Sequence, residues 1–205
     1  METKRNSGIA LIEAGRTAKR LKVFRAREFV AQGFPREYIA RLQKAGEVQR
    51  IARGLYATSD FDGDNDQMLL EVSKRFPKGV LCLLTALLFH DIGTQSPFEV
   101  WLALPRGLNF SKAAEAPIRF FKFSDAAYKF GIETHKVAGG VIRVYSPAKT
   151  VADCFKYRNK FGLDVAVEAL RDGWRNKKFS MNELAEAADA CRVRRVMQPY
   201  MEMLV

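Results

Sequence analysis

The sequence of 205 residues predicts an α+β protein with two domains. Residues 1–58 show three helix-like segments followed by an alternating hairpin pattern. The string SDFDGDNDQ at 59–67 is acidic and almost without apolar residues, and the strand-like runs beyond it have no helix-length spacers. We therefore expect an N-terminal domain over 1–58 and a C-terminal domain over 59–205, with helices around a small, mostly antiparallel sheet.

Two helices are predicted at the start of the N-terminal domain. Residues 8–20 predict the first. The second begins near Phe24, where the i, i+3, i+4 spacing of Ala26, Phe29 and Val30 indicates one buried face, and it ends at Gly33.

A third helix follows, with Pro35 suited to its first turn because proline lacks the N–H that would have no helical partner. Its apolar and polar residues separate onto two sides. The packed side is predicted to hold Tyr38, Ile39, Leu42 and Ala45. The opposite side carries Arg36, Glu37, Ala40, Arg41 and Lys44.

A hairpin is predicted directly after Gly46. Residues 47–51 alternate between polar and apolar and predict the first strand, residues 52–54 predict the turn, and residues 55–58 predict the second strand. Arg53 is expected at or near the tip.

The C-terminal domain is predicted to begin with helices at about 66–76 and 80–89. Strands are expected at 98–104, 118–123, 132–137 and 141–145, the last two joined by Gly139-Gly140. Ser146 and Pro147 suit the start of a helix that buries Ala148, Val151, Ala152 and Phe155. A capping box from Ser180 to Glu183 opens a helix with Leu184, Ala187, Ala188 and Cys191 inward.

The formal net charge of +11 is concentrated at the N-terminus. Residues 1–60 hold 13 Lys and Arg against 6 Asp and Glu, residues 61–145 hold 10 against 9, and residues 146–205 hold 11 against 8. This distribution indicates a polyanionic partner for the N-terminal domain, and the alternative is a basic surface that serves solubility alone.

The order of helix, turn, helix and basic hairpin predicts a winged helix-turn-helix domain that binds double-stranded DNA. We assign Arg36, Arg41 and Lys44 to the helix face that reads bases, Arg50 and Arg53 to the wing, and Arg25 and Arg27 to flanking phosphate contacts. The alternative is a winged-helix module for protein interaction, with cations that only solvate it.

Other chemistry is weakly indicated. The acids Asp60, Asp62, Asp64, Asp66 and Glu71 have the spacing of a calcium loop, but Asn65 replaces the required glycine and a strand precedes the loop, so we expect a solvated linker and no metal site. His90 and His135 are predicted to be structural. No P-loop, GxGxxG, GxSxG or HExxH motif occurs, so no cofactor and no catalysis are expected.

The competing enzyme reading is a degenerate nuclease-like protein that acts on nucleic acid. Glu99 lies in a strand-like run but lacks the lysine that such a site needs.

The chain is expected in the cytoplasm. Cys82, Cys154 and Cys191 are widely spaced and match no metal-ligand pattern, which indicates reduced, buried thiols. The most apolar run, 80–89, is about half the roughly 20 residues of a membrane span, and no secretion signal is evident.

The basic C-terminus allows two readings. In the first, its cations bind a ligand, either by extending the DNA-binding surface or by contacting an acidic partner protein. In the second, they only offset the negative end of the helix dipole at helix C-termini. They are Arg171, Arg175, Lys177, Lys178, Arg192, Arg194 and Arg195.

Three stretches together resemble the AbiEi-like antitoxins of type IV bacterial toxin–antitoxin systems, over nearly the whole chain. They are EFVAQGFPREYIARLQKAGEVQRIARGLYA, LLTALLFHDIGT and YSPAKTVADCFKYRNKFGLDVAVEALRDGW. The resemblance implies a winged helix that represses its own operon at inverted repeats and a C-terminal domain that neutralises a co-encoded nucleotidyltransferase-type toxin. By position, the DNA contacts fall on Arg36, Arg41, Lys44, Arg50 and Arg53.

We expect the protein to be a monomer or a weak dimer, with two protomers pairing on DNA. We expect it not to associate with a membrane. An antitoxin that acts through protein contacts without binding DNA is the third possibility.

Overall fold

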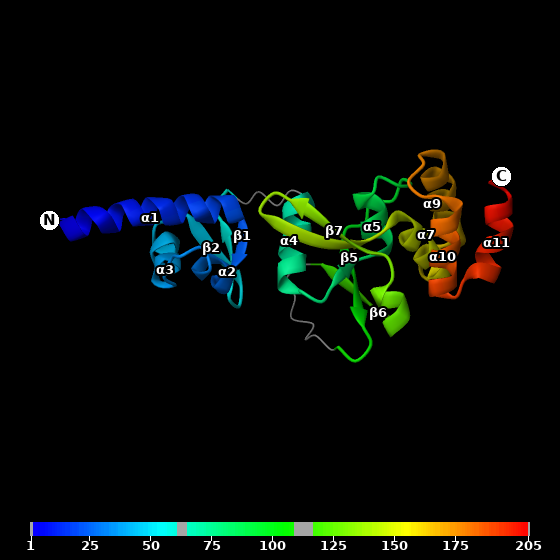
Figure 1. The fold of residues 1–205 in the computed structure, drawn as a ribbon, viewed down its shortest axis with the longest axis horizontal. Helices are drawn as coiled ribbons and strands as arrows, with labels where there is room; N and C mark the ends of the chain where they lie inside the picture. The colour runs from blue at the N-terminus through cyan, green and yellow to red at the C-terminus, as the bar shows by residue number, and fades with distance from the viewer. Residues whose placement is uncertain (1, 61–64, 109–116, 205) are drawn as a thin grey trace. The chain divides into compact units, whose positions relative to one another are not determined.

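The computed structural model describes residues 2–60, 65–108 and 117–204 (Figure 1). It is a mixed α+β structure with one three-stranded and one five-stranded sheet. The chain divides into two compact units: Met1–Pro77 with His135–Ile142, and Lys78–Thr134 with Arg143–Val205. Among the described residues, each helix is too short or too polar to span a lipid bilayer.

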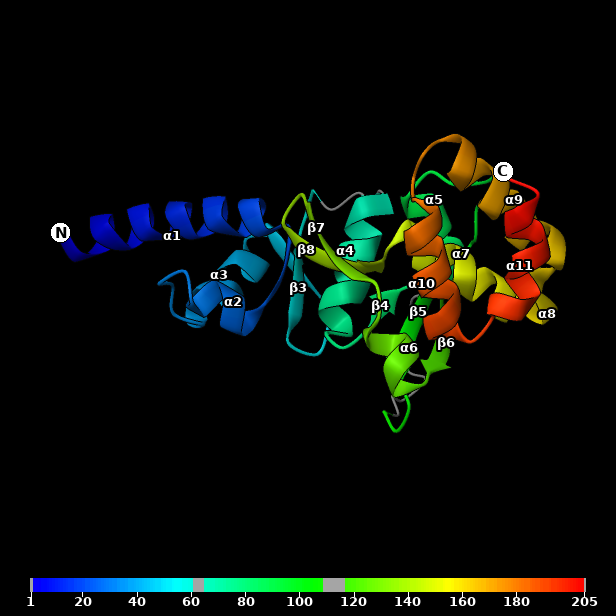
Figure 2. The same cartoon turned by 45° about the vertical axis from the view of Figure 1, so that its right-hand side comes forward.

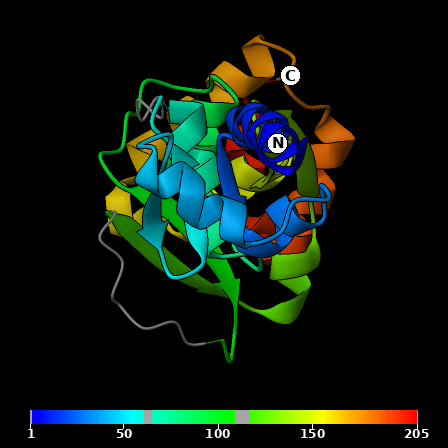
Figure 3. The same cartoon turned by 90° about the vertical axis from the view of Figure 1, so that its left-hand side faces the viewer.

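The first unit begins with three helices and a small sheet. Its elements are α1 (Glu2–Leu21), β1 (Val23–Arg25), α2 (Ala26–Val30), α3 (Glu37–Lys44), β2 (Val48–Ala52), β3 (Leu55–Thr58) and α4 (Asn65–Arg75). The sheet order is β1-β3-β2 and both pairings are antiparallel. Figure 3 views α1 end-on, with α2 and α3 beside it.

One apolar cluster holds α1, α2, α3 and the three-stranded sheet together. Phe24 from β1 stacks on Phe29 from α2 and on Tyr56 from β3, with ring centroids 5.3 and 5.9 Å apart. Ile39 and Leu42 of α3 are buried in the same cluster as Ala14 and Ala18 of α1. The buried side of α3 thus fixes which of its residues face outward.

Four predictions for this unit are corrected. Residues 23–25, expected to open the second helix near Phe24, form strand β1, because their backbone pairs with β3. Val30 and Ala45, expected to be packed, are exposed, and Ala26 is only half-buried. The first helix extends beyond the predicted 8–20. The hairpin prediction is confirmed, with Arg53 and Gly54 in the turn.

The second unit contains most of the five-stranded sheet and a group of helices. Its elements are β4 (Val80–Leu81), α5 (Leu83–Phe89), β5 (Val100–Pro105), β6 (Ile118–Phe123), α6 (Asp125–Lys129), α7 (Pro147–Lys156), α8 (Arg158–Phe161), α9 (Leu163–Arg175), α10 (Met181–Cys191) and α11 (Arg194–Glu202). Strands β7 (Ile132–Val137) and β8 (Gly140–Tyr145) contribute residues to both units.

The five-stranded sheet has the order β6-β5-β4-β8-β7. β4 pairs antiparallel with β5, whereas β4 with β8 and β5 with β6 are parallel. The predicted "mostly antiparallel" sheet is therefore wrong, and the sheet is mixed. The error has a physical source: the start of the apolar run 80–89 is not helix but β4, a strand too short to show a period, and it pairs with β8 far along the sequence.

Helix α7 lies at the centre of the helices of the second unit (Figure 2). Every side chain from Ala148 to Phe155 is buried. Its predicted start is confirmed, since the Ser146 hydroxyl accepts a hydrogen bond from the backbone N–H of Lys149. The capping box at Ser180 is confirmed as well, with Leu184, Ala187, Ala188 and Cys191 inward.

Candidate nucleic-acid interface

The outward side of α3 carries the cations predicted for it. Arg36, Arg41 and Lys44 are exposed, while Ile39 and Leu42 on the opposite side are buried. Tyr38, predicted as packed, is half-buried. The 3.6-residue period therefore separates a packing side from a solvent side on this helix.

Arg41 is partly positioned by its neighbours on α3. Its guanidinium carbon lies 5.1 Å from the ring centroid of Tyr38, and its Nη2 atom lies 3.8 Å from Glu37 Oε1. The side chain remains 48% exposed. The long distance to Glu37 and this exposure make the ion pair weak, so Arg41 stays available to a stronger anion.

The hairpin of β2 and β3 presents two arginines. Arg53 lies exposed in the turn, where Gly54 has φ of +70°, a conformation that suits glycine. Arg50 is exposed, and its Nε donates to Ala52 O at 3.3 Å. The register shifts between Arg50 and Ala52, which indicates a bulge that strengthens the local twist of the hairpin.

Arg25 is used inside the first unit. Its Nε and Nη2 donate to the carbonyl of Lys74 at 3.1 and 2.9 Å, and Nη2 also lies 3.4 Å from Arg75 O. These carbonyls belong to the last turn of α4, where a cation satisfies carbonyls that have no helical partner. Arg25 is half-buried and its orientation is fixed.

Three of the seven predicted cations meet around one hollow. A depression with a volume of about 390 Å³ is lined by Arg25, Ala26, Arg27, Arg36, Gly54 and Pro77. The backbone N–H of Ala26 donates to Gly54 O at 3.3 Å, which ties the start of α2 to the hairpin turn. The fold thus brings together Arg25, Arg27 and Arg36, which the sequence placed in two different functional groups.

Gln43 is a candidate that sequence reasoning missed. It is exposed on α3, beside the solvent side that carries Arg36 and Lys44. A glutamine amide can pair with adenine through two hydrogen bonds in the major groove. The helical period of α3 is the signal that indicates Gln43, but a pattern defined by cations does not include a neutral residue.

The acidic string lies only partly within the described residues. Asp62 and Asp64 of the calcium-loop pattern lie outside them. Asp60 is exposed, and a hydrogen bond from the Thr58 side chain holds its pKa below the usual value. Among the described residues, no group of three or more His, Cys, Asp or Glu side chains is arranged to hold a metal ion.

The candidates for catalysis have structural partners. His90 Nε2 lies 2.7 Å from Tyr145 O, and because a carbonyl only accepts, this nitrogen donates. Glu99 pairs with Arg119 at 2.9 Å, and the Arg119 guanidinium lies 5.0 Å from the Trp101 ring.

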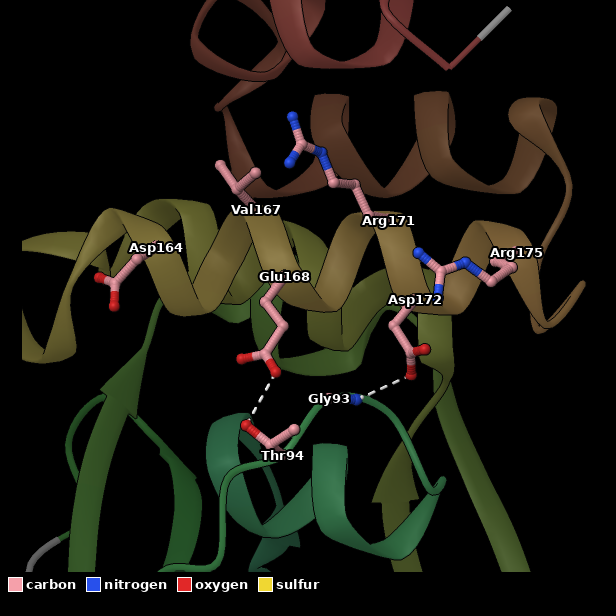
Figure 4. A pocket seen from close by; sticks show the side chains of 8 residues that line it. All are labelled: Gly93, Thr94, Asp164, Val167, Glu168, Arg171, Asp172 and Arg175. Carbon is pink, nitrogen blue, oxygen red and sulfur yellow. Dashed lines mark hydrogen bonds between the residues drawn. The ribbon is translucent and has the colours of Figure 1, made fainter.

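The second unit has a hollow of its own, about 520 Å³ in volume (Figure 4). Glu168 and Asp172 of α9 point to the 93–94 loop, where Thr94 Oγ1 donates to Glu168 at 2.8 Å and Gly93 N donates to Asp172 at 2.9 Å. Arg171 and Arg175, predicted as part of the basic C-terminus, line the same hollow. Its two inward carboxylates are thus already hydrogen-bonded to the loop.

The other cations of the basic C-terminus are exposed. They are Lys177, Lys178, Arg192, Arg194 and Arg195. Arg194 pairs with Asp189 at 2.7 Å.

Comparison with known proteins finds a family model that matches part of the chain and a solved structure with a similar fold. Residues 16–59 match the family model described as "AbiEi_4: Transcriptional regulator, AbiEi antitoxin". This segment contains all seven predicted DNA-binding cations. No curated protein matches the chain.

A solved structure extends the similarity to most of the chain. The crystal structure of the Rv2827c protein from Mycobacterium tuberculosis aligns with a TM-score of 0.59, covering 95% of this chain and 78% of that chain at 12% identity. At this identity the similarity concerns the fold alone. Over residues 16–59, the chain is therefore similar to the AbiEi antitoxins that are transcriptional regulators, the family that its sequence resembles.

Proposed function

We propose that this protein is a DNA-binding antitoxin whose first unit acts as a winged helix-turn-helix. The observation that carries the proposal is the set of exposed cations on α3 and on the turn between β2 and β3, all within the segment that matches the regulator family. Lys and Arg side chains that release counterions from phosphates give DNA binding most of its affinity.

In this proposal α3 enters the major groove. An α-helix fits that groove, and side chains on its outer side reach base edges while flanking cations bind phosphates. Arg41 and Lys44 lie on that outer side, and Gln43 lies beside them. Arg36, at the start of α3, is the fourth side chain available to the DNA.

The turn of the hairpin is the wing. Arg53 is exposed at its tip and Arg50 is exposed on β2, so both are available to phosphates or to a narrow minor groove. Arg27 on α2 is likewise available to phosphate, whereas Arg25 is held by α4.

The wider role follows from the family. We propose that the protein represses its own operon at inverted repeats, with two protomers pairing on the DNA. We also propose that the second unit neutralises a co-encoded nucleotidyltransferase-type toxin, and that the protein acts in the cytoplasm.

Fluorescence anisotropy with a labelled duplex from the upstream region of the gene tests the DNA-binding proposal. The wild type is compared with an Arg41→Ala/Arg53→Ala variant. An Arg16→Ala/Lys19→Ala variant is the matched control, since it removes two exposed cations from α1. We expect binding at low salt and a loss in the first variant alone; no binding by the wild type would refute the proposal.

The antitoxin proposal needs its own test. Co-expression with the neighbouring open reading frame is expected to rescue cells from the toxin it encodes. Failure of rescue, with both proteins present by immunoblot, would remove the antitoxin half and leave the DNA-binding half standing.

A further inference from the structure

The hollow formed by Arg25, Arg27 and Arg36 is an unusual electrostatic feature of the first unit. Three of its six lining residues are charged, and all three are arginines. The described residues that line it include no carboxylate. Like charges around one concave surface raise the local potential, so the hollow attracts an anion.

The three guanidiniums are not neutralised by carboxylates. In the described part of the chain, no ion pair within 4.0 Å involves Arg25, Arg27 or Arg36. The acceptors of Arg25 are neutral carbonyls. Glu28, adjacent to Arg27 in sequence, accepts from the backbone N–H of Arg25 at 2.7 Å and pairs with Lys74 Nζ at 3.0 Å. Glu37, adjacent to Arg36, lies 3.8 Å from Arg41 Nη2.

One of the three arginines is preorganised and two are adjustable. The α4 carbonyls fix Arg25, so little side-chain entropy remains for it to lose when a ligand binds. Arg27 and Arg36 are exposed and can close over the ligand. The backbone N–H of Ala26 is bonded to Gly54 O and is not a donor to the ligand, whereas the arginine side chains offer N–H donors.

The chemistry of these donors selects phosphate. The planar fork of a guanidinium offers two parallel N–H donors, which match the oxygens of a phosphate group. Gly54 contributes no side chain to the rim, and a Cβ built on it would meet nothing within 4 Å, so the hairpin side of the hollow is open. A backbone phosphate can therefore approach from solvent.

We infer that this hollow binds a phosphate of the backbone of duplex DNA, with Arg36 acting together with Arg27 as a sequence-independent clamp and not as a base-reading residue. The inference rests on the proposed DNA binding. It predicts that Arg36, the N-cap residue of the recognition helix α3, differs in function from Arg41 and Lys44 within that helix.

The test compares two duplexes of equal length, one from the upstream region and one of scrambled sequence, over a series of salt concentrations. The variants are Arg27→Ala/Arg36→Ala, the charge-preserving Arg27→Lys/Arg36→Lys, and the α1 control Arg16→Ala/Lys19→Ala. Thermal unfolding of each variant confirms that the fold is kept.

The alanine pair is expected to weaken binding to both duplexes by the same factor, about tenfold or more, because charge-assisted hydrogen bonds are lost. The plot of log K against log salt is expected to become less steep by about 1, the effect of one lost phosphate contact. The lysine pair is expected to keep the salt slope but to lose part of the affinity, since lysine cannot bind in the bidentate manner. The α1 control is expected to match the wild type.

Two outcomes would overturn the inference and leave DNA binding intact. One is unchanged affinity of the alanine pair for both duplexes. The other is a loss confined to the upstream duplex, which would make Arg36 a base-reading residue.

If the wild type binds neither duplex, the proposed function itself fails. A nuclear magnetic resonance titration with inorganic phosphate then identifies the source of the ligand. Shifts at Arg27 and Gly54 that vanish in the alanine pair would assign the hollow to free phosphate and contradict the DNA assignment.

Discussion

Lys149 and Asp153 form an ion pair one turn apart on α7, and neither side chain is exposed to solvent. The Lys149 Nζ atom lies 4.1 Å from the ring centroid of Tyr145 and 4.7 Å from that of Phe123. The Cys191 thiol donates to the other oxygen of Asp153 at 3.2 Å. Burial raises the pKa of Asp153, and Lys149 offsets only part of this effect.

Removing one partner of this pair is expected to destabilise the second unit strongly. Lys149→Met leaves a buried carboxyl without its cation, which costs about 3–5 kcal/mol in the free energy of unfolding. Urea denaturation measures this loss. The double variant Lys149→Met/Asp153→Leu removes both charges and is expected to recover much of the stability. A single variant as stable as the wild type would show that the pair is not needed.

The three cysteine thiols are expected to be unreactive in the folded protein. Cys82, Cys154 and Cys191 are fully buried, and burial raises the pKa of each thiol. A buried thiol with a raised pKa forms little of the reactive thiolate. Labelling with Ellman's reagent should detect no thiol in native protein and three per chain in denaturant. Rapid labelling without denaturant would contradict the burial.

The capping box of α10 is expected to make stability depend on pH. The backbone N–H and hydroxyl of Ser180 both donate to Glu183 Oε2 at 2.7 Å, and these bonds lower the pKa of Glu183. Because the pKa is lower in the folded state, the stabilisation is present above the unfolded pKa and is lost as pH falls through the folded pKa.

The stability difference between wild type and Glu183→Gln should therefore shrink as the pH is lowered from 7 into the acid range. Urea denaturation at several pH values measures the difference. Glu186→Gln, an exposed position on the same helix, controls for the lost charge. A difference that stays constant with pH would contradict the assignment. Ser180→Ala is expected to cost about 1 kcal/mol at neutral pH.

Gly173 on α9 is expected to resist replacement by alanine. Alanine favours a helix by roughly 0.5–1 kcal/mol over glycine. A Cβ at this position, however, would lie 3.0 Å from Cζ of the buried Phe179 ring and closer still to Cε1. Overpacking of this kind costs about 1–3 kcal/mol, so the clash outweighs the helix propensity.

A double-mutant cycle tests this explanation. Gly173→Ala is expected to lower the unfolding free energy by about 1 kcal/mol in the wild type and by less in a Phe179→Leu background. If Gly173→Ala lowers the unfolding free energy equally in both backgrounds, the clash with Phe179 is not the cause of the destabilisation.

The elements with strong periods could be predicted from the sequence. The outward cations of α3 follow from a helical repeat, and the β2–β3 hairpin follows from alternation around Gly54. Strands β1 and β4 could not be predicted in this way. β1 has three residues and β4 has two, which is too few to show a period, and both form by pairing with strands distant in the sequence.

The long-range contacts could not be predicted for a related reason, since they also depend on residues far apart in the sequence. The pattern at Ala148, Val151, Ala152 and Phe155 indicates one buried side of a helix and places Lys149 and Asp153 on its outside. Both are buried because α5, α9, α10 and α11 all pack against α7. In the same way, nothing near Arg25 in the sequence indicates that α4 fixes its side chain.

The central claim is that the exposed cations of α3 and of the β2–β3 turn bind DNA. The most direct test is the anisotropy titration of the upstream duplex with wild-type protein and the Arg41→Ala/Arg53→Ala variant. The account predicts salt-sensitive binding by the wild type and a loss of about tenfold or more in the variant. A variant that binds as tightly as the wild type, with the same salt dependence, would contradict it.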